Sequence, residues 1–132
     1  MTRYFTIEEA QGLVNWIEGI FNDLSQLLKR LDELNDNIEQ MQNPVISNGV
    51  GNVVAERIES MKLELDDTLA RINEKIQPIH ERGILVKSIQ HGLVDFPYIR
   101  EGREVNLCWH AGEREIKSWH EVDVGFVGRQ PL

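Results

Sequence analysis

A long stripe of apolar residues near the start of the chain most strongly restricts the folds open to it. Apolar positions recur at alternating spacings of three and four from Ile7 to Ile38, the period of an amphipathic helix. Thr6 is followed three residues later by Glu9, so the two form a capping box at the helix start. A second apolar row at a seven-residue step widens the stripe. The pattern predicts one long helix in the segment 1–42, beginning at this capping box and of the kind found in helical bundles.

A narrower stripe with the same period predicts a second helix over residues 53–83. Asn and Gly residues around Pro44 predict a loop over residues 43–52. Pro78 and Gly83 mark the expected end of the second helix. Because two long helices joined by a loop of about ten residues most simply fold back on each other, we expect an antiparallel helical hairpin.

The period changes to two in the last third of the chain. Residues 104–110 alternate between apolar and polar side chains, which predicts a strand. Residues 111–113 predict a turn, and residues 115–121 the returning strand. We therefore expect a mainly α chain of the α+β class. A long helical hairpin is followed by a small β-hairpin unit over residues 84–132, and residues 1–132 form a single domain.

The predicted turn sets the register of the β-hairpin. If His110 pairs with Glu115 across the turn, Val105 opposes His120. His120 then points to the apolar side of the hairpin, whereas Cys108 points to the other side. We therefore do not expect Cys108 and His120 to bind the same metal ion.

The width of the first stripe predicts self-association. Three apolar positions per heptad are more than one neighbouring helix covers, and leaving an apolar side chain in water forgoes about 1.5–3 kcal/mol. We expect two hairpins to pair into an antiparallel four-helix homodimer with coiled-coil-like heptads. The residues expected in the dimer core are Ile17, Leu24, Leu31 and Ile38.

A second face of the first helix carries Gly12, Trp16 and Gly19. Each glycine inside a helix costs about 1 kcal/mol relative to alanine, so a closely packed neighbour would explain the pair. One interpretation is that the β unit docks on this face. The alternative is that the helix tolerates the two glycines without any such contact.

The charge balance excludes several classes of partner. The 132 residues carry a net charge of −8, which disfavours binding to nucleic-acid phosphates or to an anionic membrane surface. The chain has neither an apolar run long enough to span a membrane nor the apolar core of a signal peptide. Cys108 is a single cysteine and forms no internal disulfide. We therefore expect a cytoplasmic protein.

Several short strings resemble a known family. They are YFTxEEA at residues 4–10, GLVDFP at 92–97, GREV at 102–105, LCW at 107–109, WHE at 119–121 and GFxGRxPL at 125–132. Together they resemble the bacterial family called domain of unknown function 2203, over nearly the whole chain. The resemblance implies no activity, because that family is uncharacterised.

Candidate metal or ligand residues gather in the last third of the chain. Asp95, Glu113, His120 and Glu121 are ligand types for a divalent metal. Their spacing matches no paired Cys-x-x-Cys or His-Glu-x-x-His motif. The alternative is structural: His120 is hydrogen-bonded to a carboxylate such as Asp95 and holds the hairpin on the helices.

Two further residues have alternative interpretations. Cys108 becomes a nucleophile only beside a base that lowers its pKa, and a cysteine within a strand is more commonly a small buried apolar residue. Arg129 follows two glycines, so backbone amides and its guanidinium can hold an anion there. The alternative is that Arg129 pairs with an acidic helix of a partner subunit.

Two functions remain open from the sequence. The first is a non-enzymatic cytoplasmic homodimer that serves as an interaction or assembly module. The second is a metal- or small-ligand-binding protein with its site between the β-hairpin and the start of the first helix. The sequence predicts no catalytic residue, and a divalent metal is the cofactor considered.

Overall fold

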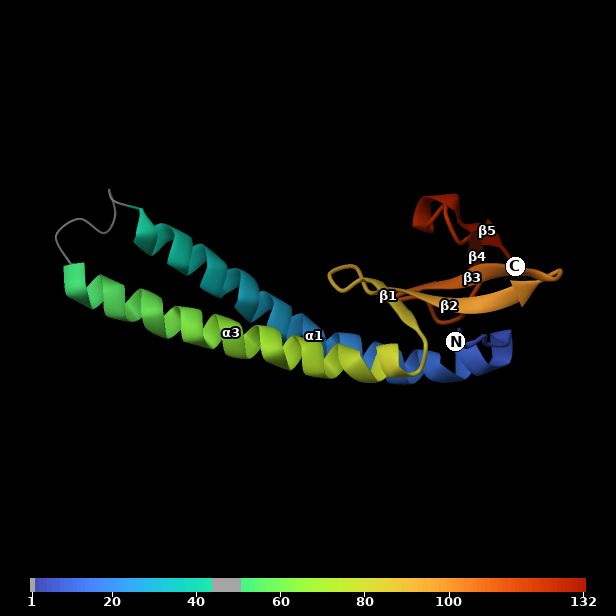
Figure 1. The fold of residues 1–132 in the computed structure, drawn as a ribbon, viewed down its shortest axis with the longest axis horizontal. Helices are drawn as coiled ribbons and strands as arrows, with labels where there is room; N and C mark the ends of the chain where they lie inside the picture. Colours follow the sequence, from blue (N-terminus) through green and yellow to red (C-terminus); the bar gives the residue numbers. More distant parts are fainter. Residues whose placement is uncertain (1, 44–50) are drawn as a thin grey trace. The chain divides into compact units, whose positions relative to one another are not determined.

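The computed structural model describes residues 2–43 and 51–132, apart from the side chains of residues 51 and 52. Its elements are α1 (Ile7–Gln42), α3 (Gly51–Glu81), β1 (Leu85–Ser88), β2 (Leu93–Arg100), β3 (Arg103–His110), β4 (Ser118–Glu121), the 3₁₀ helix η1 (Phe126–Gly128) and β5 (Gln130–Pro131) (Figure 1). Two helices and a five-stranded antiparallel sheet give the predicted α+β class. The chain forms two compact units, called here the sheet unit (Met1–Asp23 with Lys75–Leu132) and the helical unit (Leu24–Glu74).

The start of α1 is fixed by the predicted capping box. The backbone N–H of Thr6 donates to Glu9 Oε1, and the backbone N–H of Glu9 donates to Thr6 Oγ1, each at 3.0 Å. These two bonds satisfy donors that the first helical turn leaves without partners. The helix continues to Gln42, as the length of the apolar stripe predicts. Most of the predicted loop, residues 44–50, lies outside the described residues.

The second helix is shifted toward the N-terminus relative to the prediction. It runs from Gly51 to Glu81 and includes Pro78 in its last turns, so the proline does not end it. The chain leaves the helix at Gly83, whose φ of 86° favours glycine. The N–H of Gly83 donates to the carbonyl of His80 at 2.9 Å, which ends the helix close to the predicted residue.

In the helical unit, the second half of α1 and the first part of α3 form the predicted helical hairpin. The Arg30 Nη2 group of α1 donates to Glu64 Oε1 of α3 at 2.9 Å. Leu24 and Ile38, two residues of the expected dimer core, are already buried in the single chain, and Leu31 is half-buried. In the sheet unit, the fourth residue, Ile17, is likewise fully buried. Leu31 is therefore the member of this set with appreciable area left for a partner.

The sheet is larger than the predicted hairpin. Its strands follow chain order, β1-β2-β3-β4-β5, and each neighbouring pair is antiparallel. The longest pairing joins β2 to β3 over eight residue pairs. Glu101 and Gly102 connect these strands with φ angles of 53° and 77°, the positive values that a tight hairpin turn needs. None of the described helices is both long and apolar enough to cross a membrane.

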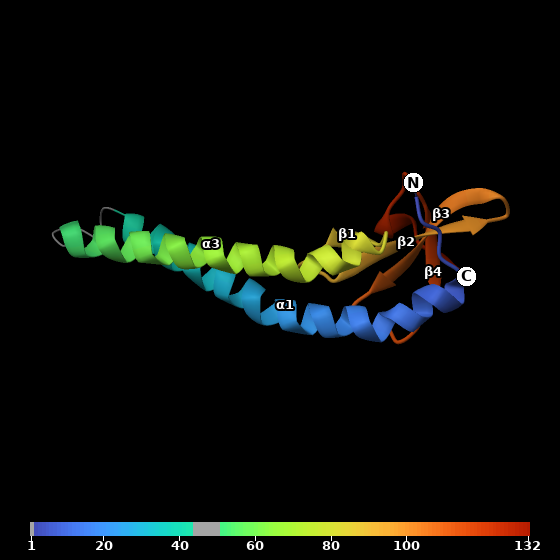
Figure 2. The same cartoon turned by 60° about the horizontal axis from the view of Figure 1, so that its bottom comes forward.

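One face of the sheet packs on the start of α1, within the sheet unit (Figure 2). The ring of Phe21 lies 6.4 Å from that of Trp109, and the ring of Phe5 lies 5.4 Å from that of Phe96. Gln11 of α1 also binds the loop after β3. Its side chain donates to the carbonyl of Arg114 at 3.1 Å and accepts from the N–H of Ile116 at 2.8 Å.

The sheet does not dock on the glycine face of α1. A Cβ added at Gly12 or Gly19 meets no described atom within 4 Å, so neither glycine permits a close approach there. Trp16 is half-buried under the guanidinium of Arg82, 4.5 Å from its ring centroid. The docking interpretation is thus wrong for this face, and the tolerated-glycine alternative fits the structure. The sheet contacts the main apolar stripe instead.

Candidate metal centre

The register of β3 and β4 differs from the sequence prediction by one residue. Asn106 opposes His120, whereas the sequence pattern places Val105 there. The difference arises because β4 begins at Ser118 rather than at Glu115. Since side chains alternate between the faces of a sheet, a shift of one residue moves His120 to the opposite face.

An irregular loop over residues 111–117 causes this shift. The Glu113 carboxylate accepts from the N–H of His110 at 2.8 Å, and the carbonyl of Glu113 accepts from the indole N–H of Trp109 at 2.9 Å. Gln11 holds the other end of the loop at Ile116. These bonds hold an extended loop in place of the short turn that alternation alone predicts.

The corrected register brings three potential metal ligands together on neighbouring strands. Asp95 of β2 opposes Cys108 of β3, and His120 of β4 lies diagonally across from Cys108. One ligand atom from each residue lies within 4.8 Å of the other two. All three side chains are buried, with 1–2% of each residue exposed. They point away from the face that packs on α1, because each is offset by one residue from the core positions of its strand.

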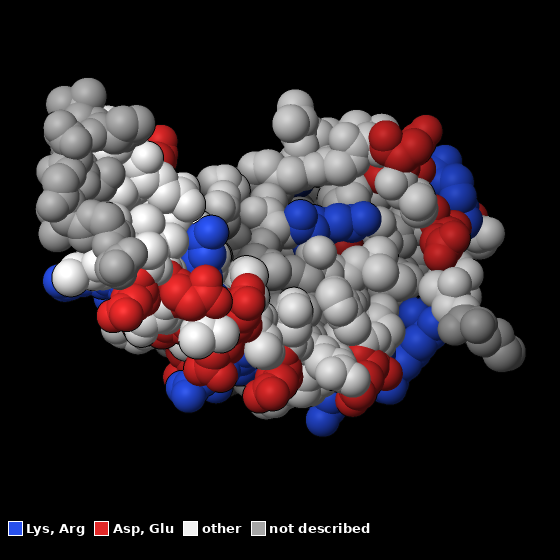
Figure 3. All heavy atoms as spheres, turned by 60° about the vertical axis from the view of Figure 1, so that its left-hand side comes forward, with Lys and Arg blue, Asp and Glu red and all other residues white. Residues whose placement is uncertain are grey.

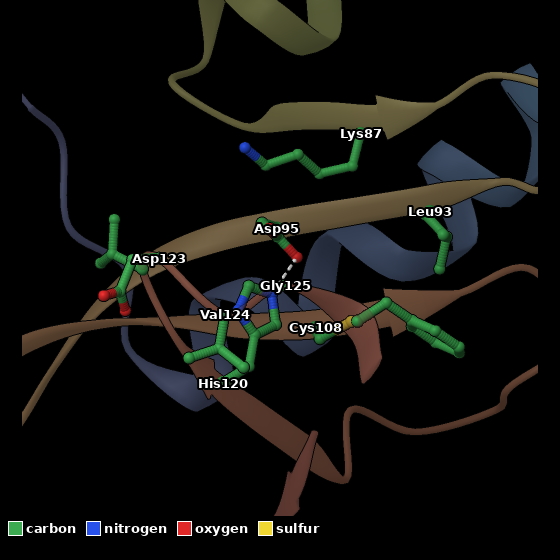
Figure 4. A pocket seen from close by; sticks show the side chains of 10 residues that line it. Lys87, Leu93, Asp95, Cys108, His120, Asp123, Val124 and Gly125 are labelled. Atoms are coloured by element: carbon green, nitrogen blue, oxygen red, sulfur yellow. Dashed lines mark hydrogen bonds and ion pairs between the residues drawn. The ribbon is translucent and has the colours of Figure 1, made fainter. Parts of the chain in front are cut away.

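The three side chains border a cavity of about 270 Å³ within the sheet unit (Figure 4). The segment from Val122 to Phe126 forms one wall, and Leu93 and Lys87 complete the lining. Figure 4 shows the Asp95 carboxylate directed at the His120 ring, with Cys108 beside both. The face of the sheet opposite α1 is therefore covered, and its polar centre is kept largely from solvent.

The hydrogen bonds of His120 identify the proton that a metal ion would replace. Its Nδ1 lies 2.8 Å from the carbonyl of Glu121. A carbonyl only accepts, so Nδ1 carries a proton. Nε2 lies 3.0 Å from Asp95 Oδ1, and a second proton must lie between these two atoms for them to be bonded. The other carboxylate oxygen, Asp95 Oδ2, is buried without a hydrogen-bond partner.

The surroundings of Cys108 keep its thiol protonated. Burial, followed by the nearby charge of Asp95, raises the pKa of Cys108 to about 12. A thiol with this pKa is a poor nucleophile at neutral pH. It is nevertheless a strong ligand for a cation that displaces its proton, because the metal stabilises the thiolate.

Two predicted ligands and the predicted anion site are engaged elsewhere. The Glu113 carboxylate accepts from Arg129 Nη2 at 2.8 and 2.9 Å. Glu121 accepts from Arg103 Nη2 at 2.6 Å. Asp95 and His120 therefore remain from the predicted set of four. Within the described chain, Arg129 pairs with Glu113.

The sequence interpretation separated Cys108 from His120, whereas the structure brings them together with Asp95. The cluster lies on the face of the sheet opposite the start of α1, not between the hairpin and that helix. The structural alternative, in which His120 bonds Asp95, is correct as a contact. The signal that identifies Cys108 is the pairing of β2 with β3, since Asp95 and Cys108 are then cross-strand neighbours.

Comparisons with known proteins assign no activity to this site. A family model described as an uncharacterized conserved protein (DUF2203) matches residues 3–132. No curated protein and no solved structure matches the chain.

Proposed function

Since the chain belongs to the DUF2203 family, whose description names no activity, we propose a function from the site itself: the protein binds one zinc-class divalent metal ion. The proposed ligands are the Asp95 carboxylate, Cys108 Sγ and His120 Nε2. The observation that carries the proposal is their convergence within 4.8 Å in a buried site. Zinc accepts this mixture of oxygen, sulfur and nitrogen ligands.

The burial of the Asp95 carboxylate favours the metal interpretation over the structural one. A hydrogen bond between His120 and Asp95 would hold the strands together, but it leaves Asp95 Oδ2 without a partner. A buried oxygen left unpaired costs about 1–3 kcal/mol. A cation bound between the three side chains would satisfy this oxygen and stabilise the Cys108 thiolate at once.

The distances and the surrounding bonds also suit a metal. Tetrahedral zinc, with bonds of about 2.0–2.3 Å, separates its ligand atoms by roughly 3.3–3.8 Å. Small side-chain shifts bring atoms within 4.8 Å of one another to this spacing. The carbonyl of Glu121 holds the Nδ1–H of His120, the usual second hydrogen bond of a metal-binding histidine, and it leaves Nε2 for the ion.

Metal stoichiometry tests the proposal. We expect native mass spectrometry of the zinc-treated, desalted protein to show one zinc per chain. His120→Ala, Asp95→Asn and Cys108→Ser should each bind zinc too weakly to retain it through desalting, because each removes one of three ligands. Glu121→Gln is the matched control. Because the Glu121 carboxylate pairs with Arg103, this variant should retain full zinc occupancy. Zinc retained by all three ligand variants, or none in the wild type, would contradict the proposal.

We also propose that the helical unit pairs with a second copy of itself, which would make the protein a homodimeric assembly module. The support is a set of apolar side chains that two helices alone leave half-buried: Leu27, Leu28, Leu31, Met41, Val54, Ile58, Met61 and Leu65. A two-helix layer has no second layer over such residues, and an identical hairpin would supply one as a four-helix bundle. Asp and Glu side chains, drawn in red in Figure 3, gather on part of the face shown there. Those carboxylates would have to stay outside the interface.

Two exposed leucines of α3 provide the test of pairing. Leu69 continues the stripe of Leu65 and Ile72, whereas Leu63 lies on the opposite side of the helix. Both are exposed, by 42% and 63%, so glutamate at either site should leave the single chain folded. We expect Leu69→Glu to shift the protein from dimer to monomer in sedimentation velocity, while Leu63→Glu remains dimeric. A monomeric wild type at tens of micromolar would contradict the pairing.

A further inference from the structure

The cavity beside the three proposed ligands has the size and lining of a binding site. Its volume of about 270 Å³ holds several water molecules or one small organic molecule. Leu93, Val122, Val124 and Phe126 supply apolar surface, and Lys87 and Asp123 supply charge. A mainly apolar wall with a few charged groups is typical of small-molecule sites.

The coordination of the metal leaves one position for this cavity. Among the residues that the structure describes, three ligand-type side chains converge, and tetrahedral zinc takes four ligands. The same three side chains line the cavity, so the fourth position of a bound zinc ion would face it. Zinc sites with three protein ligands bind water or a small molecule at the fourth position.

The charges around the cavity indicate which kind of molecule would bind there. A divalent cation with the Cys108 thiolate and the Asp95 carboxylate is neutral overall. Lys87 would therefore supply the positive charge that compensates an anionic ligand, and no ion pair among the described residues involves its ammonium. Figure 4 shows its side chain extending along the strand that carries Asp95. Asp123, on the other hand, would repel an anion.

We infer that the metal centre binds a small carboxylate with a short apolar chain. The carboxylate takes the fourth coordination position, the ammonium of Lys87 compensates its charge, and the apolar chain lies against Leu93, Val124 and Phe126. This inference rests on the proposed metal function, which supplies the ion. It assigns roles to Lys87 and to the segment from Val122 to Phe126, neither of which is needed to hold the metal.

Cobalt(II) substitution tests the inference separately from metal binding. Cobalt bound to a thiolate absorbs in the near ultraviolet, which reports the metal site, and its visible bands change when the fourth ligand changes. We expect butyrate to alter the visible bands saturably while the thiolate band stays. Butan-1-ol and butylammonium, which match its chain without its charge, should have no such effect.

Two charge variants check the role of the lining. Lys87→Met should weaken butyrate binding about threefold to tenfold, as expected for a partly exposed charge pair. Asp123→Asn should strengthen it, because a repelling charge is removed. No thiolate band would overturn the metal proposal itself. A thiolate band with visible bands insensitive to butyrate, or equally sensitive to butan-1-ol, would overturn the carboxylate inference alone.

Discussion

Zinc affinity is expected to rise at least tenfold for each pH unit between pH 6 and pH 8. The pKa of Cys108, about 12, lies well above this range, so its thiol is protonated throughout and each bound ion must displace that proton. When binding releases one proton, the affinity for zinc rises tenfold for each unit by which the pH increases. Competition with a chromophoric chelator at several pH values measures the slope.

A variant isolates the contribution of the thiol. Cys108→Ala removes the thiol proton that the metal displaces. The zinc affinity of this variant should therefore be lower at every pH, and it should rise tenfold less per pH unit than that of the wild-type protein. The direction is fixed by the chemistry, because lower pH restores the proton that competes with the ion. A wild-type affinity independent of pH, or a slope unchanged in Cys108→Ala, would show that Cys108 is not a ligand.

Replacing Trp109 by alanine is expected to destabilise the protein by about 3–5 kcal/mol. Trp109 is fully buried where β3 meets α1, and its ring lies beside that of Phe21. Its indole N–H also donates to the carbonyl of Glu113, which holds the loop that sets the β3–β4 register. The substitution therefore removes both core volume and a bond that defines the site. Urea unfolding of the metal-free protein measures the loss.

Trp16 gives the matched control for this substitution. It lies on α1 but is half-buried, and Arg82 covers its ring. We expect Trp16→Ala to cost about 1 kcal/mol, mainly the cation–π contact. Trp109 is thus assigned to the interface between sheet and helix, and Trp16 lies outside it. Equal losses in the free energy of unfolding for the two variants would contradict this assignment.

The helices could be predicted closely from the sequence because their signals are local. The stripe from Ile7 to Ile38 and the pair Thr6 and Glu9 depend on spacing within one segment, and the structure begins and ends α1 accordingly. The prediction that the β unit docks on Gly12 and Gly19 failed. A glycine within a helix shows that close packing is possible there, but nothing in its sequence shows that a neighbour is present.

The proposed metal centre could be predicted only in part, because it depends on strand register. Asp95 and His120 were recognised from their chemistry, and their contact is present. Cys108 was excluded by a register wrong by one residue, which in a strand inverts every side chain. The cause is a loop held by hydrogen bonds with Gln11 and Trp109. Gln11 lies about a hundred residues from that loop in the sequence, so no local pattern signals the contact.

X-ray absorption spectroscopy of the zinc-loaded protein tests the central claim most directly, because it counts the atoms around the ion. The proposed site predicts one sulfur at about 2.3 Å and nitrogen or oxygen atoms at about 2.0–2.2 Å, four ligands in all. A zinc shell of nitrogen and oxygen alone in the wild-type protein would contradict a metal centre built from Asp95, Cys108 and His120.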